Sequence, residues 1–492
     1  MPPDITLVHA LFLSKDPVER KLMTPYFPLG ITYLAAALRD RGYAVEMFDC
    51  AFREDFGEFE EFMLRVRPPM VGITALVTVR RNALILAEIA HRHGAQVIMG
   101  GSDPTGIPEK YLWHKDSSGD FPVSAVVYGE GETTACELAD HLFQRGACAQ
   151  EMKDIAGLRL RGTDGQVLAT AARAFIRDLD SISFPARDLV DYDPYRLAWR
   201  AAHRYWSLSI VNSRGCPYEC TWCQKSAFGR SYRVRSAANS AEEMHQIKHT
   251  FAPDQLRVVD DITGISKGWV LAWRDEVSNR DAAIPFECLT RVNLVDDEML
   301  AALVQTGCKR VFVGAESGSQ KVLDSMRKGV RVEQIYSAAK AFKKADIETN
   351  FYMMVGYPGE EWPDLLQSVK VLRETLPDKF STTIAYPLPG TPFYELVRKG
   401  LLFDAEWDAD WAHSAENKLL FGRGRYNTAF YRWVVRWFHK EWEDARLSAG
   451  MEPGVRRAIG IKLGLWRSRA IVRLLGSLPG AGTIQFKPAE GL

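Results

Sequence analysis

Short apolar runs alternate with amphipathic stretches over residues 4–145. Runs of this length suit buried strands, and the stretches between them repeat apolar residues at helical spacing. One helix is expected to open at Pro28 and to stop at Gly42. The pattern predicts a doubly wound, Rossmann-like α/β domain over residues 1–145. Its expected strands are Ile5–His9, Ala44–Phe48, Val71–Leu76, Gln96–Met99 and Ala125–Tyr128, with further helices near 56–66, 80–93 and 132–144.

Ligands of such sheets bind beyond the carboxyl ends of the strands. Glycines at these ends let a ligand approach the backbone closely, although each glycine alone is better explained by an ordinary tight turn. No G-x-G-x-x-G follows the first strand, which disfavours a dinucleotide site. The strand-end residues are Leu76, Val77, Thr78, Gly100, Gly101, Ser102, Gly129, Glu130 and Gly131.

Residues 146–205 differ in pattern and are interpreted as a connector that contains a hairpin around Gly162-Thr163-Asp164-Gly165. The alternation of strands and helices resumes at Ser207 and continues to residue 395. Six successive βα units predict an open partial (β/α)6 TIM barrel over residues 206–395. Its expected strands are 208–211, 256–259, 286–289, 310–313, 347–354 and 381–385, with helices at 241–248, 296–305 and 365–372.

Three cysteines follow the first of these strands in a C-x₃-C-x₂-C spacing: Cys216, Cys220 and Cys223. Thiolates suit zinc or iron–sulfur clusters. A structural zinc site needs four protein ligands, and no fourth cysteine or histidine stands nearby. Three ligands fit a cubane cluster that leaves one iron open to a substrate. Three buried structural cysteines are the alternative, but burial gives no reason for this spacing on a loop marked by Gly215 and Pro217.

Four further strands of the predicted barrel end in residues that a packed core would not contain. Each of these residues alone is equally well explained as a solvated loop residue. Because the carboxyl ends of barrel strands gather at one face, together they indicate a common ligand. The residues are Asp260, Asp261, Arg291, Glu316, Ser317, Gly356 and Pro358.

The composition bears on the partners and the cellular location of the protein. The chain has 492 residues with 62 basic and 62 acidic ones, so nothing in its net charge predicts a nucleic-acid or membrane partner. Five of the eight cysteines are scattered singly, unlike a secreted disulfide framework. We expect no signal peptide, because the N-terminus lacks a basic region followed by an apolar run, and no apolar run approaches the roughly 18 residues of a transmembrane segment. We therefore expect a cytoplasmic protein.

Residues 396–492 are predicted to form a mainly helical region that holds six of the thirteen tryptophans: Trp407, Trp411, Trp433, Trp437, Trp442 and Trp466. A stripe that includes Phe430, Val434 and Phe438 is apolar at helical spacing. A helix packed on the barrel is the favoured interpretation, and a lid over a large planar or apolar substrate is the alternative. The basic, partly apolar segment 455–475 is compatible with contact to a membrane surface.

The three-cysteine loop, with Trp222 before the last cysteine, resembles the signature of the radical S-adenosylmethionine (SAM) enzymes. The pattern Tyr26–Ile31, Gly100-Gly101 and Tyr128–Glu132 resembles the cobalamin-binding domain of their class B members. The resemblance implies a [4Fe-4S] cluster on Cys216, Cys220 and Cys223, SAM and cobalamin. The D-x-H-x-x-G run of many other B12 domains is missing from this sequence, which implies a corrinoid without a histidine ligand, covered by the 76–80 loop.

The resemblance also assigns residues to SAM. Asp260 and Asp261 match the position that binds its amino group, where many members have Gly-Gly-Glu, and Arg291 matches a basic position used for its carboxylate or for substrate. Glu316 and Ser317 match the motif near the ribose and methionine, whereas Gly356, Pro358 and Trp222 match positions around adenine. The nine strand-end residues of the first sheet are the expected cobalamin contacts.

The implied function is a methyltransferase that cleaves SAM to a 5′-deoxyadenosyl radical and uses methylcobalamin to methylate an unactivated carbon of a small molecule. An electron donor such as flavodoxin or ferredoxin is implied. The same domains occur in the anaerobic magnesium-protoporphyrin IX monomethyl ester oxidative cyclase, which is the alternative. A non-catalytic corrinoid-binding or redox-sensing protein is a third hypothesis.

Overall fold

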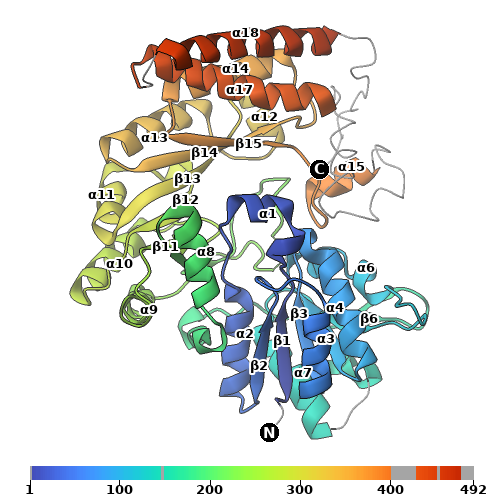
Figure 1. The fold of residues 1–492 in the computed structure, drawn as a ribbon. Coiled ribbons are helices and arrows are strands. Elements are labelled where there is room, and N and C mark those ends of the chain that lie inside the picture. The colour runs from blue at the N-terminus through green and yellow to red at the C-terminus, as the bar shows by residue number, and fades with distance from the viewer. Residues whose placement is uncertain (1–2, 146–148, 226, 400–427, 452–454, 478–492) are drawn as a thin grey trace. The chain divides into compact units, whose positions relative to one another are not determined.

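The structure is a computed structural model that describes residues 3–145, 149–225, 227–399, 428–451 and 455–477. The chain divides into two compact units. Described residues up to 217, together with 224–257, form the first unit, and residues 218–223 and those from 258 onward form the second. Figure 1 shows the elements of each unit along the chain.

The first unit is built on a seven-stranded sheet with the order β2-β1-β3-β4-β5-β6-β7 (Figure 1). Strands β1 to β5 pair in parallel, as the sequence predicted, and β6 and β7 add an antiparallel hairpin to the edge. These strands are β1 (Ile5–His9), β2 (Val45–Asp49), β3 (Met70–Thr74), β4 (Gln96–Gly100), β5 (Val123–Val127), β6 (Leu158–Arg161) and β7 (Val167–Ala169).

Helices cover both faces of this sheet because successive strand residues point to opposite sides. Val97 and Met99 of β4 are buried in one core with α3 and α4, whereas Ile98 is buried in the other with α2 and α7. The doubly wound arrangement is therefore confirmed. The helices of the first unit are α1 (Pro17–Leu22), α2 (Leu29–Asp40), α3 (Gly57–Val66), α4 (Arg80–Arg92), α5 (Ser102–Gly106), α6 (Pro108–Leu112), α7 (Glu132–Arg145), α8 (Asp193–His203) and α9 (Ala237–Thr250).

The sequence missed the short helices α1, α5 and α6, which have six, five and five residues. They are too short to show an amphipathic period, and Asp16 at the start of α1 is the clearest local signal. Its side chain accepts hydrogen bonds from the amides of Val18 and Glu19 at 2.9 and 3.0 Å. The third strand ends at Thr74, two residues before the predicted end, and a single 3₁₀ turn follows at Val77–Val79.

A second sheet has the order β15-β14-β13-β12-β11-β8, which is the sequential order of a partial barrel. The pairs β12–β13, β13–β14 and β14–β15 are parallel. The predicted six-stranded α/β barrel fold is confirmed. Its strands are β8 (Ser207–Ile210), β11 (Gln255–Val258), β12 (Phe286–Thr290), β13 (Cys308–Glu316), β14 (Glu348–Val355) and β15 (Lys379–Ile384).

The helices of the second unit include two long C-terminal ones, α17 (Thr428–Ser448) and α18 (Val455–Ser477), which lie beside α14 (Figure 1). Phe430, Val434, Trp437 and Phe438 are buried, so the apolar stripe of α17 packs against its neighbours, as the favoured interpretation predicted. Trp407 and Trp411 lie outside the described residues. The remaining helices are α10 (Lys267–Asn279), α11 (Asp297–Thr306), α12 (Gln320–Ser325), α13 (Val332–Lys344), α14 (Trp362–Thr375) and α15 (Pro392–Lys399).

Candidate active site

The cysteine motif follows a two-residue strand, β9 (Ser213–Arg214), which pairs antiparallel with β10 (Arg233–Val234). Gly215 has a φ of +83°, and a Cβ there would overlap the carbonyl oxygen of Ser231. Only glycine therefore fits before the first cysteine. Cys216 and Cys220 are buried and Cys223 is exposed, and none of the described cysteines takes part in a disulfide.

Arg291 follows β12 and lies against the cysteine segment within the second unit. Its guanidinium donates to Cys220 Sγ at 3.8 Å and stands 3.6 Å above the ring of Tyr218. A further nitrogen donates to the carbonyl oxygen of Lys328. The side chain is only 3 % exposed, so its positive charge is held against the Cys220 sulfur and away from solvent. Such a donor set fits an anionic iron–sulfur cluster.

Residues 221 and 222 anchor the same segment on the strand ends β14 and β15. The Thr221 hydroxyl lies 2.5 Å from the hydroxyl of Tyr357, and the backbone amide of Thr221 donates to the Met326 carbonyl oxygen at 3.1 Å. Trp222 packs on a buried cluster that contains Met354, Tyr357, Ala385 and Phe393. The loop that carries the last two cysteines is therefore held by side chains from several strand ends.

The end of β13 carries a buried ion pair. Lys328 Nζ donates to Glu316 Oε1 at 2.9 Å, and both residues are less than a tenth exposed. Lys328 Nζ also lies 5.4 Å from the centre of the Trp222 ring. Glu316 has a φ of +61°, a left-handed conformation that is costly for a residue with a side chain and that clusters at functional sites. Ser317 is fully buried and its hydroxyl lies 3.2 Å from that of Ser368 on α14.

The end of β14 forms a tight turn that encloses an acid. Gly356 has a φ of +80°, and its amide donates to Glu360 Oε2 at 2.6 Å. Glu360 is 2 % exposed, and Oε1 has no hydrogen-bond partner among the described residues. Burial raises the pKa of Glu360 to about 8, although the hydrogen bond from Gly356 favours the carboxylate. Pro358 is half-buried in the same turn.

The two aspartates after β11 differ in burial. Asp260 is 5 % exposed, whereas Asp261 is exposed to solvent. Asp260 is therefore the better placed of the two for a buried ligand.

The predicted cobalamin contacts gather at one edge of the first sheet, because β3, β4 and β5 are neighbouring parallel strands. Gly101 has a φ of +105°, and a Cβ there would lie 2.5 Å from the Ala75 carbonyl oxygen. Leu76 is 41 % exposed although it is apolar, and Thr78 is also exposed. A backbone edge with glycines and an uncovered leucine fits a large apolar ligand such as a corrin ring.

Glu130 lies at this edge, but its carboxylate is engaged inside the protein. It accepts from Arg214 at 3.0 Å and from Arg233 at 2.7 and 2.8 Å, and all three side chains are buried. Arg214 also donates to Glu132 at 2.6 Å. Because Arg214 and Arg233 belong to the strands β9 and β10, which flank the cysteine motif, Glu130 holds that strand pair in place.

A second buried ion pair joins the two loops beside Gly101. Arg80 donates to Asp103 through Nε at 2.7 Å and through Nη2 at 2.9 Å, and the Tyr111 hydroxyl donates to Asp103 at 2.5 Å. Burial raises the pKa of Tyr111 well above its usual value, so it stays a neutral donor. The bidentate pair fixes the loop after β3 relative to the loop after β4.

Comparison with known proteins decides what this site belongs to. The family model for the B12 binding domain matches residues 18–139, and that for the radical SAM superfamily matches residues 210–372. Both matches coincide with the two α/β regions described above. The chain is a B12-binding radical SAM protein. The resemblance noted in the sequence is thus confirmed.

Named relatives of this B12-binding radical SAM protein have different activities. An uncharacterized methyltransferase from Pyrococcus horikoshii is 28% identical over 80% of this chain and 83% of its own. An anaerobic magnesium-protoporphyrin IX monomethyl ester cyclase from Rubrivivax gelatinosus is 27% identical over 77% of this chain and 68% of its own. A solved radical SAM methyltransferase from Kitasatospora setae, with cobalamin and a [4Fe-4S] cluster bound, shares the fold with a TM-score of 0.65 and 20% identity over 82% of this chain and 79% of its own.

Sequence reasoning missed several residues that the structure places around the candidate site: Arg214, Arg233, Lys328, Tyr357 and Glu360. Glu360 could have been found from the sequence, because it is an acid that directly follows Gly356-Tyr357-Pro358-Gly359, the turn at a predicted strand end. The two arginines and Lys328 had none, since isolated cations are usually solvated and only tertiary packing brings them to buried acids.

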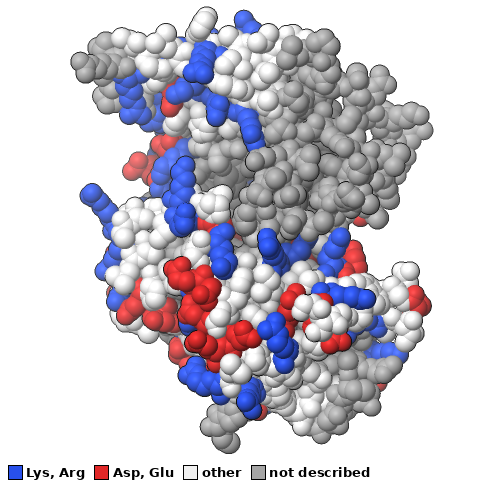
Figure 2. Space-filling model, turned by 45° about the vertical axis from the view of Figure 1, so that its right-hand side comes forward, with Lys and Arg blue, Asp and Glu red and all other residues white. Residues whose placement is uncertain are grey.

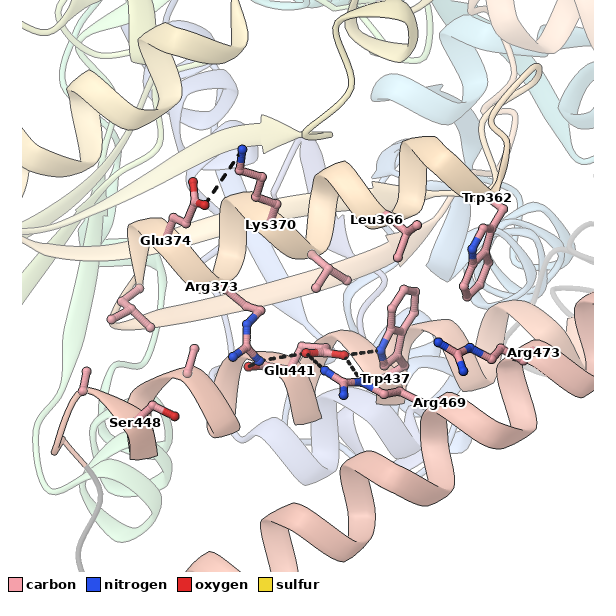
Figure 3. Close-up of a pocket in the computed structure, with 14 residues that line it drawn as sticks. Trp362, Leu366, Lys370, Arg373, Glu374, Trp437, Glu441, Ser448, Arg469 and Arg473 are labelled. Carbon is pink, nitrogen blue, oxygen red and sulfur yellow. Dashed lines mark hydrogen bonds and ion pairs between the residues drawn. The ribbon is translucent and has the colours of Figure 1, made fainter.

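The cavity drawn in Figure 3 belongs to the C-terminal helices of the radical SAM protein and contains none of the predicted site residues. Helices α14, α17 and α18 line its volume of about 760 Å³. Arg373 and Arg469 in it are both paired with Glu441, at 2.8 and 2.6 Å. Trp362 and Trp437 stack with ring centres 5.2 Å apart (Figure 3). The charged side chains Arg373, Arg469 and Glu441 are therefore explained by their role in packing these helices together.

Proposed function

We propose that the protein is a cobalamin-dependent radical SAM methyltransferase that methylates an unactivated carbon of a small molecule. The observation that carries the proposal is the buried polar set around the cysteine segment Tyr218–Cys223. Arg291 and the Glu316–Lys328 pair stand at strand ends of one sheet, and Arg291 touches Cys220. Buried charges are costly unless they serve a ligand or each other, and Arg291 has no carboxylate partner among the described residues.

In this proposal Cys216, Cys220 and Cys223 hold a [4Fe-4S] cluster, and Arg291 compensates its negative charge. The bound groups supply electron transfer to SAM, a carbon-centred radical and a transferable methyl group. The chain binds and orients them. Asp260 and Asp261 receive the amino group of SAM, with Asp260 as the buried member of the pair. Arg291 is also assigned to the carboxylate of SAM.

The remaining SAM contacts are assigned by position. Glu316 and Ser317 receive the ribose and methionine part, and the Glu316 carboxylate stays oriented by Lys328. Trp222, Gly356 and Pro358 surround the adenine. The Gly356 turn keeps its shape because its amide is bound to Glu360, and burial raises the pKa of Glu360 to about 8, so this carboxyl is mostly protonated at neutral pH.

Residues 76–78, 100–102 and 129–131 would hold cobalamin at this edge, where the 76–80 loop would cover it and where the sequence has no D-x-H-x-x-G histidine. Leu76 supplies an exposed apolar side chain, and Gly101, which has no side chain, lets a ligand come close to the backbone. Two contacts within the first unit tie the ends of the cysteine motif to this edge. Arg214 donates to Glu130, and Gln224 donates to the Ser102 carbonyl oxygen at 3.2 Å. We assign Glu130 to orienting the strand before Cys216 in addition to its predicted corrin contact.

The substrate and the electron donor stay predictions. The buried stripe of α17 weakens the argument for a tryptophan lid. Among the described tryptophans of the C-terminal region, Trp466 is the exposed one that could still support a large planar substrate. Flavodoxin or ferredoxin is the class of donor that a low-potential cluster requires. A cytoplasmic location follows from the cysteine content as a prediction. None of the described helices has the length and apolarity to cross a bilayer.

An oxidative cyclase is the second candidate, supported by the 27% identity to the Rubrivivax protein. The two candidates differ in the fate of the methyl group of SAM. A methyltransferase forms S-adenosylhomocysteine and a methylated product together with 5′-deoxyadenosine, whereas a cyclase forms 5′-deoxyadenosine without methylated product.

The test is an anaerobic assay of the full chain, reconstituted with iron, sulfide and hydroxocobalamin, with methyl-labelled SAM and extracts or compound libraries as substrate. Label in a carbon–methyl product together with S-adenosylhomocysteine supports the proposal. Deoxyadenosine that forms with unlabelled product only would overturn it in favour of the cyclase.

Two binding measurements make the test independent of the substrate. A corrin absorption band must appear and be retained on gel filtration, and about four irons per chain must be bound. A chain that binds cluster and SAM but retains no corrin would contradict the cobalamin part alone. Cys136→Ser is the matched control, because Cys136 lies on α7 and its thiol only donates to the Ala37 carbonyl oxygen at 3.4 Å.

A further inference from the structure

Helix α18 has an apolar face on each side. Ile461, Leu465 and Val472 are buried on the side that packs on the protein. On the other side, Ile459, Leu463, Trp466 and Leu474 are 55%, 63%, 73% and 61% exposed. These four follow the spacing i, i+4, i+7 and i+15, so they form one stripe along more than four turns of helix. An uncovered stripe of this size indicates a surface that binds something.

Cations flank this stripe on both sides. The sequence of α18 contains six basic residues and no acidic one. Lys462 and Arg469 form ion pairs with acids of α17, with Asp444 at 2.6 Å and with Glu441 at 2.6 Å, respectively. Arg467 and Arg473 are exposed, and within the described residues no carboxylate pairs with either. Figure 2 shows blue and white side chains with little red over the part of the molecule that carries α18.

This combination identifies the kind of partner. A helix that lies in a membrane interface presents Leu and Trp residues to the acyl chains and Lys or Arg residues to the phosphates. Tryptophan prefers this boundary, because its ring is apolar and its N–H needs a polar neighbour. A second copy of the chain fits poorly, because two copies of α18 would bring only positive charges together. Negative charge and an apolar interior are both supplied by an anionic bilayer.

We propose that α18 docks the protein on an anionic membrane surface, with Leu463 and Trp466 inserted and with Arg467 and Arg473 at the lipid phosphates. The helix lies flat, since no described helix is apolar enough to span the bilayer. The docking is independent of the assigned chemistry, because none of these residues belongs to the cofactor sites.

The experiment is flotation of the full-length protein with vesicles of phosphatidylcholine alone or mixed equally with phosphatidylglycerol. We expect binding to the mixed vesicles, little binding to the neutral ones, and release as salt is raised. Leu463→Asp combined with Trp466→Ala should abolish binding. Arg467→Gln combined with Arg473→Gln should weaken it roughly thirtyfold, as two lost cations predict.

Leu197→Asp is the matched control, because Leu197 on α8 is a leucine of similar exposure, 67%, outside this stripe. It should bind vesicles like the wild type. Brominated lipids provide a second readout, since they should quench less fluorescence in Trp466→Phe than in the wild type. Equal flotation of the wild type with and without anionic lipid would overturn the proposal. So would concentration-dependent self-association that Leu463→Asp abolishes, which would assign the stripe to a second copy.

Discussion

The strand ends of the two α/β regions offer different surfaces to a ligand. At the edge of β3, β4 and β5 the protein presents glycine backbone and an exposed leucine, and its nearby charges, Arg80 with Asp103 and Glu130 with Arg214, are paired with each other. At the ends of β12 to β14 it presents buried side chains that reach the cysteine segment, such as Arg291 and the Glu316–Lys328 pair.

The contrast teaches how each ligand is held. A ligand bound by side chains leaves chemically specific residues in the sequence, as the three cysteines and Arg291 do. A ligand bound by backbone and shape leaves mainly small residues, each of which also suits an ordinary turn. The first kind of site is disrupted by removing a functional group, and the second by adding atoms.

The largest expected effect comes from removing a thiolate. Cys216→Ser, Cys220→Ser and Cys223→Ser should each abolish SAM cleavage and lower bound iron, because a cubane site with two protein ligands is not held. Corrin retention should stay at the wild-type level, since the sheet edge does not use these sulfurs. Iron content, deoxyadenosine formation and the corrin spectrum check this. Deoxyadenosine at wild-type rates in any of the three would refute the cluster assignment.

The next effect comes from Glu130, which lies at the edge of the first sheet and pairs with both arginines of the β9–β10 strand pair. Glu130→Ala leaves the buried guanidiniums of Arg214 and Arg233 with one carboxylate fewer. Breaking a buried ion pair in this way costs about 3–5 kcal/mol of unfolding free energy. Denaturant unfolding of the apoprotein measures it, and cluster yield should also fall, because Arg214 precedes Cys216. Glu137→Ala is the control, since Glu137 is 44% exposed at its side chain and pairs with Arg173.

A smaller effect is expected for an added methyl group at the first sheet. Gly101→Ala places a Cβ 2.5 Å from the Ala75 carbonyl oxygen at a φ of +105°. The backbone and packing cost is about 2–3 kcal/mol, and hydroxocobalamin binding should weaken while SAM cleavage by the reconstituted cluster continues. Gly94→Ala has a positive φ but no atom within 4 Å of the new Cβ, so it separates backbone strain from crowding. Equal corrin affinity in Gly101→Ala and wild type would contradict the assigned edge.

The smallest effect concerns pH and Glu360. Burial raises its pKa to about 8, so the folded protein holds a proton that the unfolded chain releases near pH 4.5. The folded state therefore binds more protons between these values, and unfolding free energy falls as pH rises. From pH 6 to pH 8 the loss attributable to this group is about 2 kcal/mol. Glu360→Gln should flatten the stability profile over this window, and identical pH slopes in both proteins would contradict the raised pKa.

Much of the fold was predictable because strands and helices leave periodic patterns. Ile5–His9 was predicted with its observed bounds, and Val97 and Met99 alternate with Ile98 as a strand covered on both faces requires. The short helices α5 and α6 were not predictable, because five residues show no period. Of the site, the cysteines and Arg291 were identifiable from residue type and position. Lys328, Tyr357 and Arg214 were not, because their partners are distant in the sequence.

By itself the sequence determined the two α/β regions, their order, and the three-cysteine loop with its class of chemistry, since these depend on local periodicity and on ligand spacing within one short segment. Only the tertiary structure decided which charges are buried and what they touch. It turned Glu130 toward Arg214, buried Asp260 while leaving Asp261 exposed, and left the stripe of α18 uncovered. The physical reason is that burial and pairing depend on neighbours brought together by the fold, such as Glu130 and Arg233, which are 103 residues apart in the sequence.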